Sequence, residues 1–204
     1  MTEIVKINRE DPDPVLKKAA LRVKEGKIII FPTDTLYGIG AGIHHEGAID
    51  QIFRIKKRES GRPILILIEK PSDLLPLVKK VPPAGRELID RFWPGPLTLI
   101  FDASESLSPR LTGNTGKIGI RCPDSSLVQR LLSFLKSPIT ATSANRSHEP
   151  PCQNASDAEK YFGNQVDLIL DGGTLVSEPS TVADLTEGTI KIIRQGKIKI
   201  ENHT

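Results

Sequence analysis

The stretch GKIIIFPTDTLYGIGAG, residues 26–42, decides how the fold begins. The run at 28–31 has the length and β-branched composition of a buried strand, and Gly26 before it is typical of a helix end. The residues after this strand are rich in Pro, Thr, Asp and Gly and predict a turn. Residues 48–53 then carry apolar side chains at the spacing of an amphipathic helix. The sequence therefore predicts a strand, a loop and a helix, in this order, for this part of the chain.

Helices and strands alternate through the rest of the chain. Asp13 and Pro14 predict a cap and a first-turn proline for a helix that ends at Gly26. Further helices are expected at 73–80, 84–92 and 127–135, and strands at PILILI, LTLIF, KIGIR, 138–142, 167–170, TVADL and TIKIIR. Because a purely parallel sheet would need a crossover helix between the last strands, this order predicts an α/β fold on one open, twisted, mixed sheet flanked by helices. The length predicts a single domain over residues 1–204.

The composition is that of a globular protein, with 38% hydrophobic and 26% charged residues. The net charge of +3 suits anionic ligands, and the 4% aromatic content argues against a base-stacking surface. The apolar runs have strand length and the N-terminal segment has no apolar signal region, which predicts a cytoplasmic protein that does not enter a membrane. Cys122 and Cys152 are interpreted as reduced thiols.

Lys56 shares the apolar stripe of the helix expected at 48–56. One interpretation is a lysine whose stem covers the core and whose ammonium complements the helix dipole, followed by the solvated Lys57 and Arg58. The other is that Lys56, Arg58 and Arg62 converge on phosphate. The residues alone show that these side chains are near one another and leave both interpretations open.

Hydroxyl and amide side chains follow two of the expected strands. Thr33 and Thr35 flank Asp34, and the TSAN segment at 142–145 follows a later strand. Such positions in open α/β sheets usually bind ligands, although Asx and Ser/Thr turns give the same pattern. Ser143 lacks the G-x-S-x-G elbow and an identifiable histidine base, and no His or Cys spacing indicates a zinc site. Neither a hydrolase triad nor a protein metal site is predicted.

Six blocks, taken in order, resemble the signatures of the YrdC/Sua5 family: FPTDTLYGIGAG, IKKRESGRPILIL, RFWPGPLTLIF, GKIGIRCP, TSANRSHEP, and PSTVADL with IIRQGKI. The resemblance covers about residues 26–198 and implies the short, single-domain YrdC-like form with a deep basic cavity. It also implies a threonylcarbamoyl-AMP synthase, a nucleotidyltransferase that converts L-threonine, bicarbonate and ATP into L-threonylcarbamoyl-adenylate and pyrophosphate. This product supplies N6-threonylcarbamoyladenosine at position 37 of tRNAs that read ANN codons.

The resemblance implies roles for individual residues. Lys56 and Arg58 are the implied catalytic residues, and Ala substitution of either is expected to abolish adenylate formation with little loss of stability. The implied threonine-binding residues are Thr35, Arg121, Ser143 and Ser180, and the implied ATP-binding residues are Lys56, Arg58, Arg62, Lys117, Asn145 and Arg194. Mg2+ is expected with ATP, without protein metal ligands and without a tightly bound organic cofactor. His148 and Gln153 depart from the family pattern.

Implied partners are the substrates and the downstream tRNA threonylcarbamoyl-transferase complex, with tRNA or double-stranded RNA as a further candidate. An alternative from another class is a non-enzymatic double-stranded RNA-binding or ribosome-maturation module of the same fold. A third is a paralogue with an altered substrate. The hydroxyls of Thr35, Ser143 and Ser180 beside basic residues favour an amino-acid site over a plain RNA-binding groove.

Overall fold

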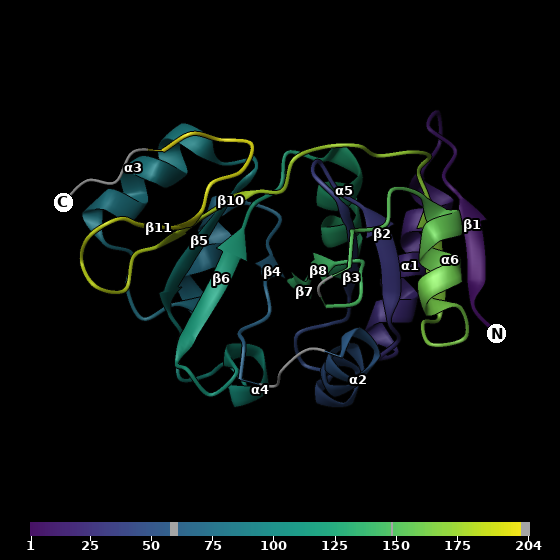
Figure 1. The fold of residues 1–204 in the computed structure, drawn as a ribbon, viewed down its shortest axis with the longest axis horizontal. Coiled ribbons are helices and arrows are strands. Elements are labelled where there is room, and N and C mark those ends of the chain that lie inside the picture. The colour runs from purple at the N-terminus through teal and green to yellow at the C-terminus, as the bar shows by residue number, and fades with distance from the viewer. Residues whose placement is uncertain (58–60, 148, 201–204) are drawn as a thin grey trace.

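The structure is a computed structural model that describes residues 1–57, 61–147 and 149–200. Arg58 and His148 lie outside the described residues. The strands form two sheets, which we call sheet A and sheet B, rather than the one sheet expected. In Figure 1 most strands of sheet B lie to the left and those of sheet A to the right, with β7 and β8 near the middle.

Sheet A has five strands. Three of them pair in parallel, β1 with β9 and β9 with β2, whereas β3 pairs antiparallel with both β2 and β8. The order across the sheet is β1 (Glu3–Lys6), β9 (Leu168–Asp171), β2 (Ile29–Pro32), β3 (Tyr37–Gly40) and β8 (Thr142–Ser143).

Sheet B has six strands and is also mixed. β5 pairs in parallel with β10 and antiparallel with β6. The order across the sheet is β11 (Lys191–Arg194), β10 (Thr181–Asp184), β5 (Leu97–Asp102), β6 (Lys117–Arg121), β4 (Ile66–Leu67) and β7 (Ile139–Thr140). Only Ala141 separates β7 from β8, so one short segment belongs to both sheets. The mixed α/β class predicted from the sequence is confirmed.

Helices cover both faces of sheet A. α1 (Asp13–Lys24) and α5 (Ser126–Leu135) pack in one apolar cluster, and α2 (Glu46–Lys56) and α6 (Ala155–Phe162) pack in the other. The IIIF run shows why both faces must be covered, because Ile28 and Ile30 point into one cluster while Ile29 and Phe31 point into the other. The remaining helices are the 3-10 helix η1 (Pro71–Leu77), α3 (Pro83–Phe92) and α4 (Pro109–Thr112).

Asp13 is the first residue of α1 and makes no side-chain cap. Its carboxylate accepts a hydrogen bond from Arg130 Nη2 of α5 at 2.7 Å, and this bond lowers the pKa of Asp13. The residue expected as a cap therefore ties α1 to α5. Gly26 follows the helix with a φ of +77°, a left-handed conformation that glycine adopts at little cost.

Residues 37–40 were expected in a turn and instead form β3. A Cβ atom at Gly40 would lie 1.9 Å from the carbonyl oxygen of Thr140, so this glycine allows two backbone segments to approach closely. Gly40 therefore serves strand packing. No helix was expected between the strands at 138–142 and 167–170, where the structure has α6. The Asn154 side chain caps this helix by accepting from the N–H of Asp157 at 2.8 Å.

No helix within the described ranges is long and apolar enough to cross a membrane. Cys122 and Cys152 are both buried and free of a disulfide. Burial raises the pKa of Cys122 to about 11 and that of Cys152 to about 12, so both thiols are protonated at neutral pH.

Tyr37 anchors residues 172–180, the yellow-green segment that crosses the top of Figure 1 from sheet A to sheet B. Its ring is fully buried, and its hydroxyl donates to the Gly173 carbonyl at 2.7 Å and accepts from the Gly172 N–H at 3.0 Å. Burial raises the pKa of the Tyr37 hydroxyl above 10.0. One buried side chain thus fixes the start of the segment that brings Ser180 to the junction of the sheets.

We expect Tyr37→Phe to lower the free energy of unfolding by about 1–3 kcal/mol, because two main-chain groups lose their buried partner. Since the folded-state pKa of Tyr37 is raised, its contribution is present below pH 10 and is lost as pH rises through the folded-state value. The difference between wild type and variant should therefore shrink above pH 10. Urea unfolding at pH 7 and pH 11 measures this, with Tyr161→Phe as the control, and equal stabilities at pH 7 would contradict it.

Candidate functional site

A cavity of about 330 Å³ lies at the junction of the two sheets. The turn between β2 and β3, strands β5, β6 and β10, residues 141–143 and the 172–180 segment contribute to its lining. The volume is at the lower end of the range for small-molecule sites. Among the described lining residues, Arg121 and Arg194 are the charged ones, and none is acidic. The cavity therefore offers positive charge to a small ligand.

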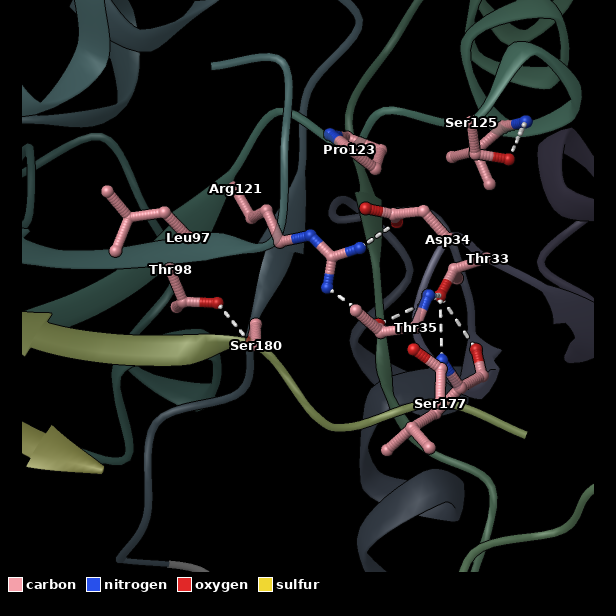
Figure 2. A network of polar contacts seen from close by, with 12 residues as sticks. Thr33, Asp34, Thr35, Leu97, Thr98, Arg121, Pro123, Ser125, Ser177 and Ser180 are labelled. Carbon is pink, nitrogen blue, oxygen red and sulfur yellow. Dashed lines mark hydrogen bonds and ion pairs between the residues drawn. The ribbon is translucent and has the colours of Figure 1, made fainter. Parts of the chain in front are cut away.

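Arg121, the last residue of β6, reaches from sheet B to the turn between β2 and β3 of sheet A (Figure 2). It is 3% exposed; its Nη1 donates to Thr35 Oγ1 at 2.9 Å and its Nη2 forms an ion pair with Asp34. Arg121 Nε and Asp34 Oδ2 are buried without a hydrogen-bond partner in the described part of the chain. Burial lowers the pKa of Arg121 and Asp34 opposes this shift, yet arginine stays protonated in proteins.

The turn at 33–36 holds Asp34 and Thr35 in place. Thr33 Oγ1 accepts from the backbone N–H of Thr35 at 3.1 Å and of Leu36 at 3.2 Å, and it donates to the Leu36 carbonyl at 2.7 Å. This is the Ser/Thr turn that the sequence offered as one interpretation. Thr33 therefore shapes the turn, and its neighbour Thr35 contacts Arg121; both threonines line the cavity.

Ser180 forms a second polar group on the sheet B side of the cavity. Its hydroxyl lies 2.9 Å from Thr98 Oγ1, and both residues are 5% exposed (Figure 2). Arg194 of the edge strand β11 donates to the Ser180 carbonyl from Nε at 3.2 Å and from Nη2 at 2.9 Å. Arg194 remains exposed over much of its side chain, although burial of its inner part lowers its pKa.

Lys56, the last residue of α2, is 2% exposed and does not extend into solvent. Its Nζ donates to the Ser143 carbonyl, to the Asn145 carbonyl at 2.6 Å and to Asn145 Oδ1 at 3.1 Å. Ser143 Oγ donates to the same Oδ1 at 2.6 Å, and Asn145 Nδ2 donates to the Glu149 carbonyl at 2.7 Å. These three oxygens all belong to residues 143–145. Lys56 thus lies under the TSAN segment and holds it.

The structure brings together five of the residues expected in the site as cavity lining: Thr35, Arg121, Ser143, Ser180 and Arg194. Lys56 and Asn145 adjoin the cavity through Ser143. Three others are placed differently or are not described. Arg62 is exposed and does not line the cavity, and Arg58 is outside the described residues.

Lys117 begins β6, whereas Arg121 ends it, so roughly 13 Å of strand separates them. Its Nζ donates to Asp184 Oδ2 at 3.0 Å, and this hydrogen bond raises the pKa of Lys117. Lys117 is not among the residues that line the cavity. Any contact with a nucleotide would need this ion pair to open.

Asp34 and Thr98 are polar residues at the site that sequence reasoning did not select. The sequence could have indicated Thr98, because it is the one polar residue in the LTLIF strand. In the structure Thr98 is 5% exposed. Asp34 was seen only as part of a turn. Its pairing with Arg121 joins positions 87 residues apart, which no local pattern indicates.

The fold and the cavity define a class of protein: an α/β protein with a small cavity between two mixed sheets, lined by a buried arginine and buried hydroxyls and suited to a small anion. Comparison with known proteins then gives the family. Residues 22–196 match the Sua5/YciO/YrdC family model, which carries the description "Telomere recombination". The chain therefore belongs to the Sua5/YciO/YrdC family, as its sequence blocks predicted.

Individual relatives agree with this assignment. The threonylcarbamoyl-AMP synthase of Pyrococcus abyssi is 35% identical over 202 residues, which is 98% of this chain and 59% of the relative. The structure of P. abyssi Sua5 complexed with L-threonine has a TM-score of 0.91 at 35% identity, covering 96% of this chain and 58% of that one. E. coli YciO has a TM-score of 0.90 at 28% identity and is matched over 98% of both chains. The chain thus spans under two thirds of the P. abyssi protein and nearly all of YciO.

Proposed function

We propose that this chain is a threonylcarbamoyl-AMP synthase that forms L-threonylcarbamoyl-adenylate from L-threonine, bicarbonate and ATP. The observation that carries the proposal is the buried Arg121, which faces Thr35 in a cavity of metabolite size. A guanidinium in such a position suits a carboxylate. The name of the P. abyssi relative and its structure with L-threonine support the choice of ligand.

In this proposal the cavity is the basic site inferred from the sequence, within a single domain formed by residues 1–204. Arg121 binds the threonine carboxylate, and Thr35, Ser143 and Ser180 contact the rest of the amino acid. The Ser143 hydroxyl donates its hydrogen to Asn145 Oδ1, so toward the ligand its oxygen acts as a hydrogen-bond acceptor. It would therefore receive a hydrogen bond from the threonine amine or hydroxyl.

The triphosphate would lie beside the TSAN segment. Arg194 lines the cavity and Asn145 adjoins it, and Lys56, Arg58, Arg62 and Lys117 complete the proposed ATP-binding set. The Lys56 ammonium donates to oxygens of residues 143–145. In its proposed catalytic role Lys56 therefore also keeps this segment in its conformation. Nucleotidyl transfer depends mainly on positioning and on positive charge at the phosphates.

Mg2+ would enter with ATP and balance phosphate charge. The described residues contain no group of three or more His, Cys, Asp or Glu side chains that could hold a metal ion. Phosphate oxygens and water are the ligands that Mg2+ prefers, so in this proposal the nucleotide carries the metal. The proposal includes no tightly bound organic cofactor.

The chemistry has two steps. The threonine amine attacks CO2 derived from bicarbonate and loses a proton, which gives a carbamate. A carbamate oxygen then attacks the α-phosphorus of ATP, and pyrophosphate leaves with the bonding electrons. The adenylate would pass to a tRNA threonylcarbamoyl-transferase complex in the cytoplasm, for modification of adenosine 37 in tRNAs that read ANN codons.

The test is incubation of the purified protein with ATP, Mg2+, bicarbonate and each amino acid in turn. We expect pyrophosphate release that requires both threonine and bicarbonate, together with an adenylate of the corresponding mass. Release with a different amino acid would favour a paralogue of altered substrate.

No release from a folded sample would contradict the proposal. If that sample bound double-stranded RNA with little dependence on salt, the non-enzymatic alternative would replace it. A binding constant that fell steeply with salt would instead indicate nonspecific attraction between basic side chains and phosphates.

A further inference from the structure

Two segments set apart in the sequence, PSTVADL at 179–185 and IIRQGKI at 192–198, meet at the edge of sheet B. They contain β10 and β11, which lie side by side in Figure 1 and pair antiparallel. The first segment supplies Ser180 and the second supplies Arg194, and both residues line the cavity. The proposed function gives these two residues different ligands, threonine and ATP. It leaves the residues that join the two segments without a role.

Thr181 is one of these joining residues, and its side chain is fully buried. Val182 lines the cavity, so Thr181, its neighbour on β10, points to the opposite face of the strand. Its Oγ1 donates to the Ile198 carbonyl and accepts from the N–H groups of Gly196 at 2.9 Å and of Ile198 at 3.2 Å. Because a hydroxyl has one hydrogen and two acceptor lone pairs, it can make these bonds together. One buried hydroxyl thus joins the two segments.

Gly196 allows the main chains of the two segments to touch. A Cβ atom at Gly196 would lie 2.1 Å from the Pro179 carbonyl oxygen, which leaves no room for a side chain. The Lys197 N–H donates to the same oxygen at 3.0 Å. Residues 196–198 therefore pack directly on residues 179–181, immediately beside Ser180.

Arg194 makes hydrogen bonds that depend on this packing. It donates to the Ser180 carbonyl from Nε at 3.2 Å and from Nη2 at 2.9 Å, and Nη2 also donates to Ser180 Oγ at 3.3 Å. Hydrogen bonds weaken steeply when their atoms separate or tilt, so Ser180 and Arg194 must keep a fixed offset. Arg194 is exposed, and burial does not fix its position. The bonds of Thr181, adjacent to Ser180, to the segment that follows Arg194 set this offset.

We propose that Thr181 is a positioning residue, which holds Ser180 and Arg194 in register at the cavity through its bonds to Gly196 and Ile198. The substrates assigned to Ser180 and Arg194 rest on the proposed function, whereas the positioning does not. Thr181 touches no ligand and acts only through its neighbours. Displacement of a substrate-positioning group by about 1 Å can cost roughly a hundredfold in rate. Turnover therefore depends on a hydroxyl that faces away from the cavity.

The experiment compares Thr181→Val, which keeps the size of the side chain and removes the hydroxyl, with Thr181→Ser, which keeps the hydroxyl. In the pyrophosphate assay we expect kcat/KM for threonine to fall by about ten- to a hundredfold in Thr181→Val and to stay near wild type in Thr181→Ser. The second readout is the NMR resonance of the Arg194 Nε–H, measured without substrates. Its bond to the Ser180 carbonyl slows exchange with water, so it should be lost in Thr181→Val and retained in Thr181→Ser.

Thr2→Val is a matched control. Thr2 Oγ1 donates to the Val166 carbonyl at 2.6 Å and accepts from the Asn164 N–H at 2.9 Å, so it also joins two segments of main chain. None of these residues lines the cavity. Thr2→Val should lower stability and leave both kcat/KM and the Arg194 resonance at their wild-type values. This result would separate positioning from a general loss of stability.

A wild-type Arg194 resonance in folded Thr181→Val would overturn the inference, whatever the turnover of that variant. If Thr181→Val does not fold, the wild-type protein decides, because rapid exchange of the Arg194 Nε–H and of the Gly196 and Ile198 amides would also overturn it.

The outcome is separable from that of the proposed function. If wild type turns over threonine and folded Thr181→Val does so equally well, the inference about Thr181 falls and the synthase proposal stands. If no amino acid turns over and the Arg194 resonance still depends on the Thr181 hydroxyl, Thr181 keeps its positioning role and the synthase proposal falls.

Discussion

Arg121→Met should lower the free energy of unfolding by about 3–5 kcal/mol and abolish threonine binding. The substitution preserves a long apolar stem but leaves Asp34, whose side chain is 11% exposed, as an unpaired buried carboxylate. Breaking a buried ion pair by removing one partner is costly, because the remaining charge loses its compensation. Urea unfolding and threonine calorimetry measure the two effects.

A double variant separates stability from binding. Arg121→Met combined with Asp34→Leu removes both charges, and replacement of a buried pair by apolar side chains is often neutral. We therefore expect most of the lost stability to return while threonine binding remains absent. Arg130→Met, which breaks an exposed pair with Asp13, should change stability little. A double variant as unstable as Arg121→Met would contradict the assigned pairing.

Lys56→Ala should abolish adenylate formation and also lower the free energy of unfolding by about 1–3 kcal/mol. The sequence alone predicted little loss of stability, on the assumption that this side chain was exposed. The assumption of exposure is wrong for Lys56, because the residue is 2% exposed and its ammonium donates to oxygens of Ser143 and Asn145. Removal of the ammonium takes away the one donor that these oxygens of Ser143 and Asn145 share, and it loosens the TSAN segment.

The neighbouring lysine provides a matched control. Lys57 is exposed and follows α2 in a left-handed conformation, so Lys57→Ala should change neither unfolding nor pyrophosphate release. Lys56→Met tests whether stem length alone preserves the fold, and it should lose activity as Lys56→Ala does. Wild-type unfolding together with wild-type turnover in Lys56→Ala would refute the role given to this residue.

The sequence predicted those elements whose signal is local. Apolar spacing indicated α2, α3 and α5, and the IIIF, LTLIF and KIGIR runs indicated β2, β5 and β6. Elements without such a signal were missed: β3 resembles a glycine-rich turn, and α6 begins in a polar segment capped by Asn154. For β3 a tertiary contact decides the structure, since Gly40 is needed where β3 meets Thr140, whereas α6 depends on a local cap.

The sequence by itself determined the mixed α/β class, the family, and the types of side chain available for a site that recognises a small anion. Only the tertiary structure decided that the strands divide into two sheets, that Arg121 crosses between them to Asp34, and that Lys56 is buried beneath the TSAN segment. The physical reason is the range of the interactions. Periodicity and turn chemistry depend on residues a few positions apart, whereas the polarity and charge of a cavity depend on which distant segments pack together.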